Sequence, residues 1–180
     1  MKRTKVVNFI SGAGAGKSVM SALLYTELKM MHKSTEIVPE FAKWLIYRDQ
    51  LDKLRDQYYV STKQYEMIKA VDGKVEYCIA DSGIFTGLFY NKEYPDNVSD
   101  VKKTEAMIMS RMAEFCNIYI YLERNDEYPF EKEGRVHNEQ QSRDIDVKLR
   151  ELMDSMGIEY ISVKSDKSNI KQIIEYVLRK

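Results

Sequence analysis

The segment from Phe9 to Ser18, which reads FISGAGAGKS, places three glycines and two alanines directly before a lysine and a serine. Glycine loses more conformational freedom on folding than any other residue, so a cluster of glycines indicates an unusual turn or a close approach to the backbone. An apolar run over residues 6–10 precedes the cluster, and a helical pattern over residues 19–31 follows it. The chain must therefore pass from a buried strand through a tight bend into a helix.

This order of strand, loop and helix is the setting that the phosphate-binding pattern G-x-x-x-x-G-K-[ST] requires. In such a loop, backbone N–H groups and the positive end of the helix dipole surround a phosphate. Lys17 is predicted to reach the β- and γ-phosphates of a nucleoside triphosphate such as ATP, and Ser18 to ligate Mg²⁺. Ser11 stands where the pattern has its first glycine, so a positive φ there would be strained. The predicted nucleotide-binding residues are Gly12, Ala13, Gly14, Ala15, Gly16, Lys17, Ser18 and Val19.

Apolar runs of strand length alternate with helical patterns along the whole chain. The predicted strands cover residues 6–10, 35–38, 75–80, 118–122 and 158–163, and the predicted helices cover residues 19–31, 41–54, 62–71, 101–115, about 145–156 and 170–178. This alternation predicts an α/β fold, with a five-stranded parallel sheet covered by helices on both faces. At 180 residues, 44% of them hydrophobic, the chain is expected to form a single domain over residues 1–180.

The charge balance limits the partners. Lysine plus arginine and aspartate plus glutamate are equal at 28 each, so no overall positive field exists to collect nucleic acid or anionic membrane. A small-molecule partner fits better, and a homodimer is left open. No segment has transmembrane or signal-sequence character, and Cys78 and Cys116 lie in or beside apolar runs, where free thiols are expected. We therefore expect a cytoplasmic protein.

Two acidic residues follow predicted strands, at the edge of the sheet where ligands collect in folds of this class. Asp81 ends the third strand and is predicted to hold Mg²⁺ directly or through water. Glu40 follows the second strand and is predicted to accept a proton from an attacking hydroxyl or to help fix the metal. The alternative for either acid is that it only caps the next helix.

Residues 124–143 are polar and charged, without a steady apolar period, between the fourth strand and the next helix. We predict a lid in which Arg135 and Arg143 fold over bound triphosphate and stabilise its charge, with Arg124 as a further candidate. The alternative is a solvated loop, because glutamates interleave with these arginines.

Aromatic residues lie on the segments that would roof an acceptor site. Trp44 could stack on a planar ring there, but it shares a helical stripe with Phe41 and Leu54, which favours packing in the core. His137 has no partner at ligand spacing and is predicted to lie on the surface.

Several short segments resemble known kinases. VPEFAKW is similar to the segment after the second strand in deoxyribonucleoside kinases and in bacterial nicotinamide riboside kinase domains, which implies that Glu40 lies beside the reacting hydroxyl. IADSGIFTGLFYNK resembles their third-strand motif, which a helix follows, although Ser82 and Gly83 stand where deoxyribonucleoside kinases have arginine and serine. TKQYEMI resembles the helix that supplies a glutamine, here Gln64, to the nucleobase. EKEGRVHNEQQSRDID resembles the arginine-bearing lid.

The resemblance implies a three-layer P-loop kinase fold with a lid over residues 124–143, and ATP- and Mg²⁺-dependent phosphoryl transfer to a nucleoside-like or nucleoside monophosphate acceptor. Two alternatives remain: a nucleotide-dependent switch or NTPase module that acts through a protein partner, and a kinase of polynucleotide ends. Taken together, the predicted catalytic residues are Lys17, Glu40, Asp81, Arg135 and Arg143, the metal ligands are Ser18 and Asp81, and the acceptor-binding residues are Glu40, Trp44 and Gln64.

Overall fold

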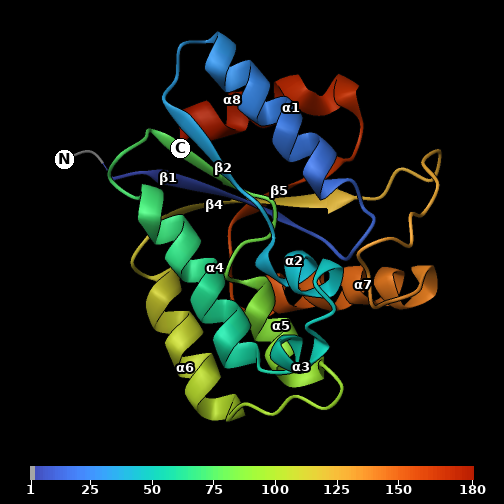
Figure 1. Cartoon of the computed structure of the whole chain (residues 1–180). Coiled ribbons are helices and arrows are strands. Elements are labelled where there is room, and N and C mark those ends of the chain that lie inside the picture. Colours follow the sequence, from blue (N-terminus) through green and yellow to red (C-terminus); the bar gives the residue numbers. More distant parts are fainter. Residues whose placement is uncertain (1–2) are drawn as a thin grey trace.

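A computed structural model describes residues 3–180 and contains the predicted five-stranded sheet (Figure 1). The strands are β1 (Lys5–Ile10), β2 (Thr35–Val38), β3 (Tyr77–Ala80), β4 (Cys116–Glu123) and β5 (Tyr160–Lys164). Their order is β2-β3-β1-β4-β5, and every neighbouring pair is parallel. All five carboxyl ends therefore lie at one edge of the sheet, and the central strand β1 leads into the glycine-rich loop.

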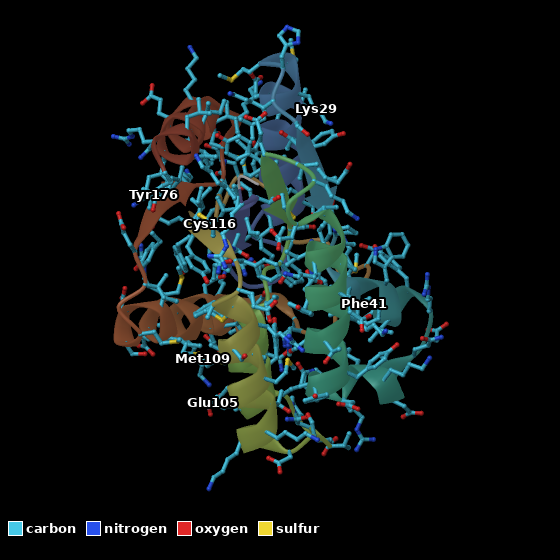
Figure 2. The ribbon with its side chains drawn as sticks, turned by 90° about the vertical axis from the view of Figure 1, so that its left-hand side faces the viewer. Lys29, Phe41, Glu105, Met109, Cys116 and Tyr176 are labelled. Carbon is cyan, nitrogen blue, oxygen red and sulfur yellow. The ribbon has the colours of Figure 1, made fainter. Side chains whose placement is uncertain are left out.

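Helices cover both faces of the sheet, as the alternating pattern predicts. Figure 1 shows α1 (Lys17–Met30) and α8 (Ile170–Arg179) on one face, with α4 (Gln57–Val71), α5 (Thr86–Glu93), α6 (Val101–Met112) and α7 (Glu139–Ser155) on the other. A short 3₁₀ turn, η1 (Lys167–Asn169), precedes α8. In Figure 2, Tyr176 of α8 and Met109 of α6 lie on opposite sides of Cys116, at the start of β4. The fold is a three-layer α/β sandwich.

Successive residues of the central strand face opposite layers. Val7 and Phe9 pack with the residues of α1 and α8, whereas Val6 and Ile10 pack with those of α4 to α7. All four side chains are fully buried. A strand buried on both faces has no polar side, which explains why the strands read as continuous apolar runs.

The segment predicted as one helix over residues 41–54 forms two, α2 (Phe41–Tyr47) and α3 (Leu51–Leu54). Asp49 between them has a φ of 55°, which a continuous right-handed helix cannot contain. Trp44, within α2, is 48% exposed, so its predicted place in the core is wrong. Helix α4 begins at Gln57, earlier than predicted, because the Asp56 carboxylate caps it.

Other sequence-based expectations concern the thiols and the membrane. Cys78 and Cys116 are both free thiols, as predicted. Within residues 3–180, no helix combines the length and the apolar character needed to cross a bilayer.

The core packing predicts a large cost for truncating a side chain of α1 that lies against the sheet. Leu24 is fully buried, so Leu24→Ala should lower the free energy of unfolding by about 2 to 5 kcal/mol. Leu178 of α8 is 36% exposed, so Leu178→Ala should cost less than about 1 kcal/mol. Urea unfolding of the two variants measures both values, and equal losses would contradict this assignment of the core.

Candidate active site

The glycine-rich loop joins β1 to α1 with two glycines in left-handed conformations. Gly16 precedes the first turn of α1 with a φ of 91°, and a Cβ there would lie 2.0 Å from the Ser165 hydroxyl. Gly14 has a φ of 78°. Ser11 is not among the non-glycine residues with positive φ, so the serine in place of the first glycine fits without backbone strain.

The interior of this loop is built to hold an anion. Lys17 is buried, and its Nζ donates to the carbonyl oxygens of Ser11 and Gly12, both at 2.9 Å. Within residues 3–180, the backbone N–H groups of residues 13–18 donate hydrogen bonds to no acceptor. Unpaired amides at the start of a helix, together with an ammonium group, form a concave site for phosphate.

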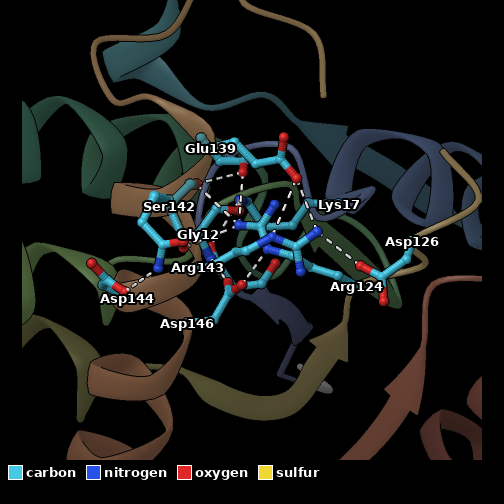
Figure 3. Close-up of polar contacts among 12 residues, drawn as sticks. Gly12, Lys17, Arg124, Asp126, Glu139, Ser142, Arg143, Asp144 and Asp146 are labelled. Carbon is cyan, nitrogen blue, oxygen red and sulfur yellow. Dashed lines mark hydrogen bonds and ion pairs between the residues drawn. The ribbon is translucent and has the colours of Figure 1, made fainter. Parts of the chain in front are cut away.

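The outer side of the loop is tied to α7 (Figure 3). The Gly12 N–H donates to Asp146 Oδ1 at 2.6 Å, and Asp146 also pairs with the Arg124 guanidinium. Arg124 Nη2 and Ser142 Oγ both donate to the Ala13 carbonyl oxygen, at 2.9 and 2.6 Å. These contacts fix the loop backbone from outside. Sequence reasoning missed Ser142 and Asp146, because their contacts with the loop depend on the packing of α7 and not on a local sequence pattern.

Ser18 and Asp81, the two predicted metal ligands, lie in contact with each other. Ser18 Oγ donates to Asp81 Oδ2 at 2.7 Å, so the carboxyl end of β3 faces the first turn of α1. Asp81 is 8% exposed, and its buried Oδ1 has no hydrogen-bond partner in the described part of the chain. A hydroxyl and an unpaired carboxylate oxygen are hard oxygen ligands of the kind that Mg²⁺ prefers beside phosphates.

Glu40 is half-buried in the wall of a cavity that also contains Lys17. It holds the N-cap position of α2, but its side chain makes no capping hydrogen bond, so capping does not account for this acid. Loss of hydration raises the pKa of Glu40 above its ordinary value of 4.5, and the Asp81 charge raises it further. Lys17, Lys43 and Arg135 act in the opposite direction.

One cavity of about 490 Å³ connects the phosphate loop with Glu40, α4, α5 and the lid. Gln64 lies in its wall, and both ends of its amide bind the backbone on either side of Glu40. Its Oε1 accepts from the Phe41 N–H at 2.9 Å, and its Nε2 donates to the Pro39 carbonyl oxygen at 3.3 Å. Gln64 therefore holds the Glu40 segment in place.

The two arginines predicted for the lid lie in different surroundings. Arg135 lines the cavity beside Gly14, with its guanidinium over the Phe130 ring at 4.8 Å and only 14% of its side chain exposed. Arg143 does not line the cavity; its side chain is 41% exposed and pairs with Asp126 and Glu139. The structure thus brings Arg135 to the loop, whereas Arg143 lies in α7, which begins at Glu139, so the predicted lid over residues 124–143 is shorter than the sequence suggested.

The structure places two aromatic residues, His137 and Trp44, elsewhere than the sequence predicts. His137 is half-buried, lines the cavity and stacks on Tyr90 with an interplanar angle of 3°, so its predicted place on the surface is wrong. Burial lowers the pKa of this imidazole. Trp44, predicted as an acceptor contact, is absent from the cavity wall and packs against Tyr47 instead.

The fold and the loop define a P-loop protein with a nucleoside-kinase-like fold. The chain belongs to the AAA domain family, whose model matches residues 6–170. No curated protein matches it in sequence. Solved structures, described next, confirm the resemblance to P-loop kinases at the level of the fold.

Three solved structures illustrate the likeness. A NadR protein in complex with NR has a TM-score of 0.70 and 15% identity over 98% of this chain and 52% of that chain. A NadR protein in complex with NAD and AMP-PNP has a TM-score of 0.68 and 16% identity, over 98% and 50%. Deoxyadenosine kinase from M. mycoides with bound dATP has a TM-score of 0.61 and 18% identity, over 98% of each chain. The chain thus spans about half the length of the NadR chains.

The two arginines at the base of the lid should contribute unequally to stability. Arg124→Ala should lower the free energy of unfolding by about 3 kcal/mol, because it leaves the nearly buried Asp146 carboxylate without its cation. Arg143→Ala is the matched control and should leave the unfolding midpoint nearly unchanged, because its ion pairs are exposed to solvent. Thermal and urea unfolding measure both effects; a larger loss from Arg143→Ala would refute the assigned roles.

Proposed function

We propose that the chain is an ATP- and Mg²⁺-dependent kinase that transfers the γ-phosphoryl group to a small acceptor, either a nucleoside-like hydroxyl or a nucleoside monophosphate. The observation that carries the proposal is the single cavity that joins a phosphate loop to a half-buried acid, Glu40. The nucleotides bound in two of the similar structures, AMP-PNP and dATP, support the same assignment of the loop.

The loop would bind the triphosphate through the unpaired amides of residues 13–18 and the Lys17 ammonium group. Ser18 and Asp81 would hold Mg²⁺, which neutralises charge on the phosphates when bound. Arg135, beside Gly14, would add positive charge from the lid side and keep water from the transferring group. Positioning and charge neutralisation are the main demands of phosphoryl transfer.

Glu40 would serve the acceptor. As the acceptor oxygen bonds to the γ-phosphorus, the bond from that phosphorus to the β–γ bridging oxygen breaks and ADP leaves. The hydroxyl proton passes to the Glu40 carboxylate, whose raised pKa makes it a better proton acceptor than an ordinary glutamate. Gln64 would hold the Glu40 carboxylate in position by hydrogen bonding to the backbone on both sides of Glu40.

The cavity favours a small acceptor over a polynucleotide end. Its acceptor part is walled by α4, α5 and the lid, and the chain carries equal numbers of acidic and basic residues. A polynucleotide kinase needs a basic track along the nucleic-acid backbone.

Incubation with γ-labelled ATP, saturating Mg²⁺ and a panel of nucleosides, nucleoside monophosphates and nicotinamide riboside tests the proposal. Label should pass to at least one acceptor of the panel, because the loop and the proton acceptor share one cavity. Chromatography of the labelled products measures the transfer. Binding of ATP with no transfer to any member would refute the kinase and favour a nucleotide-dependent switch.

Glu40→Gln separates acceptor chemistry from nucleotide binding. The variant should bind ATP with unchanged affinity and lower kcat for transfer by about a hundredfold to ten-thousandfold, because an amide cannot take the proton. Lys17→Ala serves as the contrasting variant, since it should lose triphosphate binding itself. Equal turnover by Glu40→Gln and the unaltered protein would remove Glu40 from the mechanism.

The raised pKa of Glu40 predicts the acid side of the pH profile. A proton acceptor works in its ionised form, so kcat/KM should fall as the pH decreases through a pKa above 4.5. Glu40→Gln should lack this decrease, and ATP and the acceptor titrate identically in both assays, so the difference between the profiles isolates Glu40. Parallel profiles for the two proteins would contradict its role.

A further inference from the structure

Helix α4 buries a polar stripe. Three of its buried residues, Gln57, Ser61 and Gln64, are polar, and their spacing of four and three residues places them on one helix face. All three line the cavity, and none is more than 6% exposed. Buried polar side chains require hydrogen-bond partners, so this stripe should find its partners in the protein or in a ligand.

The three residues differ in what they already bind. Both ends of the Gln64 amide are occupied by the backbone beside Glu40. Gln57 donates through Nε2 to the Leu54 carbonyl oxygen at 2.7 Å, while its Oε1 has no partner within residues 3–180. Ser61 Oγ is buried and likewise unpartnered in the described chain. The free hydrogen-bonding capacity of the stripe therefore belongs to Gln57 and Ser61.

The cavity wall that contains these two residues is partly apolar and aromatic. It includes Leu54, Val60, Ile84, Tyr90 and Tyr94. The cavity-lining lysines and arginine of the described chain, Lys17, Lys43 and Arg135, all act on the Glu40 carboxylate and thus gather at the reacting end. An unpaired amide oxygen in a partly apolar, partly aromatic pocket suits an N–H group on the edge of a planar ring.

We propose that Gln57 and Ser61 are specificity-determining residues that hold the polar edge of the acceptor's ring, an amino- or carboxamide-bearing heteroaromatic. Gln57 Oε1 accepts from the N–H of the amino or carboxamide group. The Ser61 hydroxyl, which is packed against Gly87 in this structure, supplies the second contact after rotating about its Cα–Cβ bond toward the cavity. Gln64 is left as the positioning residue for Glu40. This assignment rests on the proposed kinase function and adds to it the part of the acceptor that is recognised.

Matched acceptor pairs test the proposal. Adenosine is compared with purine riboside, which lacks the amino group, and nicotinamide riboside with pyridine riboside, which lacks the carboxamide. Gln57→Leu should raise KM about tenfold for the acceptor that carries the group and leave KM unchanged for its partner, because only the first loses a hydrogen bond. The two pairs also distinguish an amino group from a carboxamide as the ring substituent.

Ser61→Ala keeps the test independent of folding defects. It removes a buried, unpaired hydroxyl, so its melting temperature should equal or exceed that of the unaltered protein, while KM for the preferred acceptor rises several-fold. Ser21→Ala is the matched control, because Ser21 Oγ is also buried and unpartnered in the described chain but lies outside the cavity wall. That variant should keep both its stability and its KM.

The outcomes separate this inference from the proposed function. Two results would overturn the specificity assignment and leave the kinase intact, provided that the unaltered protein transfers phosphate. In the first, Gln57→Leu raises KM equally for both members of a pair. In the second, neither Gln57→Leu nor Ser61→Ala raises KM. No transfer by the unaltered protein to any panel member overturns the kinase and the assignment with it. A selective loss for the amino- or carboxamide-bearing acceptor supports both.

Discussion

Arg124 and Asp146 form a nearly buried ion pair on the outer side of the phosphate loop, and the loop conformation depends on it. The Asp146 carboxylate accepts a hydrogen bond from the Gly12 N–H, while Arg124 donates one to the Ala13 carbonyl oxygen. The backbone groups that point away from the cavity are thus paired with protein, whereas the amides of residues 13–18 that follow them have no acceptor in the described chain. The loop enters binding already shaped, so a phosphate need not supply the energy to order it.

The sheet and the loop were predictable because their causes are local. Residues 6–10 read as a strand buried on both faces, and G-K-S after them requires a bend followed by a helix. The contacts that Arg124, Ser142 and Asp146 make with the loop could not be predicted from the sequence. Asp146 reaches Gly12 only because β4 pairs beside β1 and α7 packs against the loop. Arg143 shows the limit well. It neighbours Ser142 in sequence, but one residue turns a helix by about 100 degrees, so Ser142 faces the loop and Arg143 faces solvent.

Burial explains the rest of the site better than residue type does. Gln64 carries the amide that kinase resemblance assigns to a nucleobase, yet its hydrogen bonds go to the backbone around Glu40. Unpaired buried oxygens lie instead on Asp81, which contacts Ser18, and on Ser61, in the cavity wall; within residues 3–180 they also lie on Ser11, Ser21 and Thr104. An unpaired buried polar atom costs stability, and in the proposed kinase the metal and the acceptor would supply partners to Asp81 and Ser61.

The lid between the two arginines of its base touches three parts of the site. Phe130 lies against Gly14 of the loop, Gly134 lies against Tyr47 of α2, and His137 stacks on Tyr90 of α5. These contacts are few and partly exposed, whereas the base is held by the buried Arg124 pair. In the proposed kinase, opening the middle of the lid would break these contacts and shift Arg135 relative to the phosphates, while the Arg124–Asp146 pair keeps the loop in place. In the proposed kinase, the loop fixed from outside would hold the triphosphate, and the weaker lid contacts would be the ones that open to admit the acceptor.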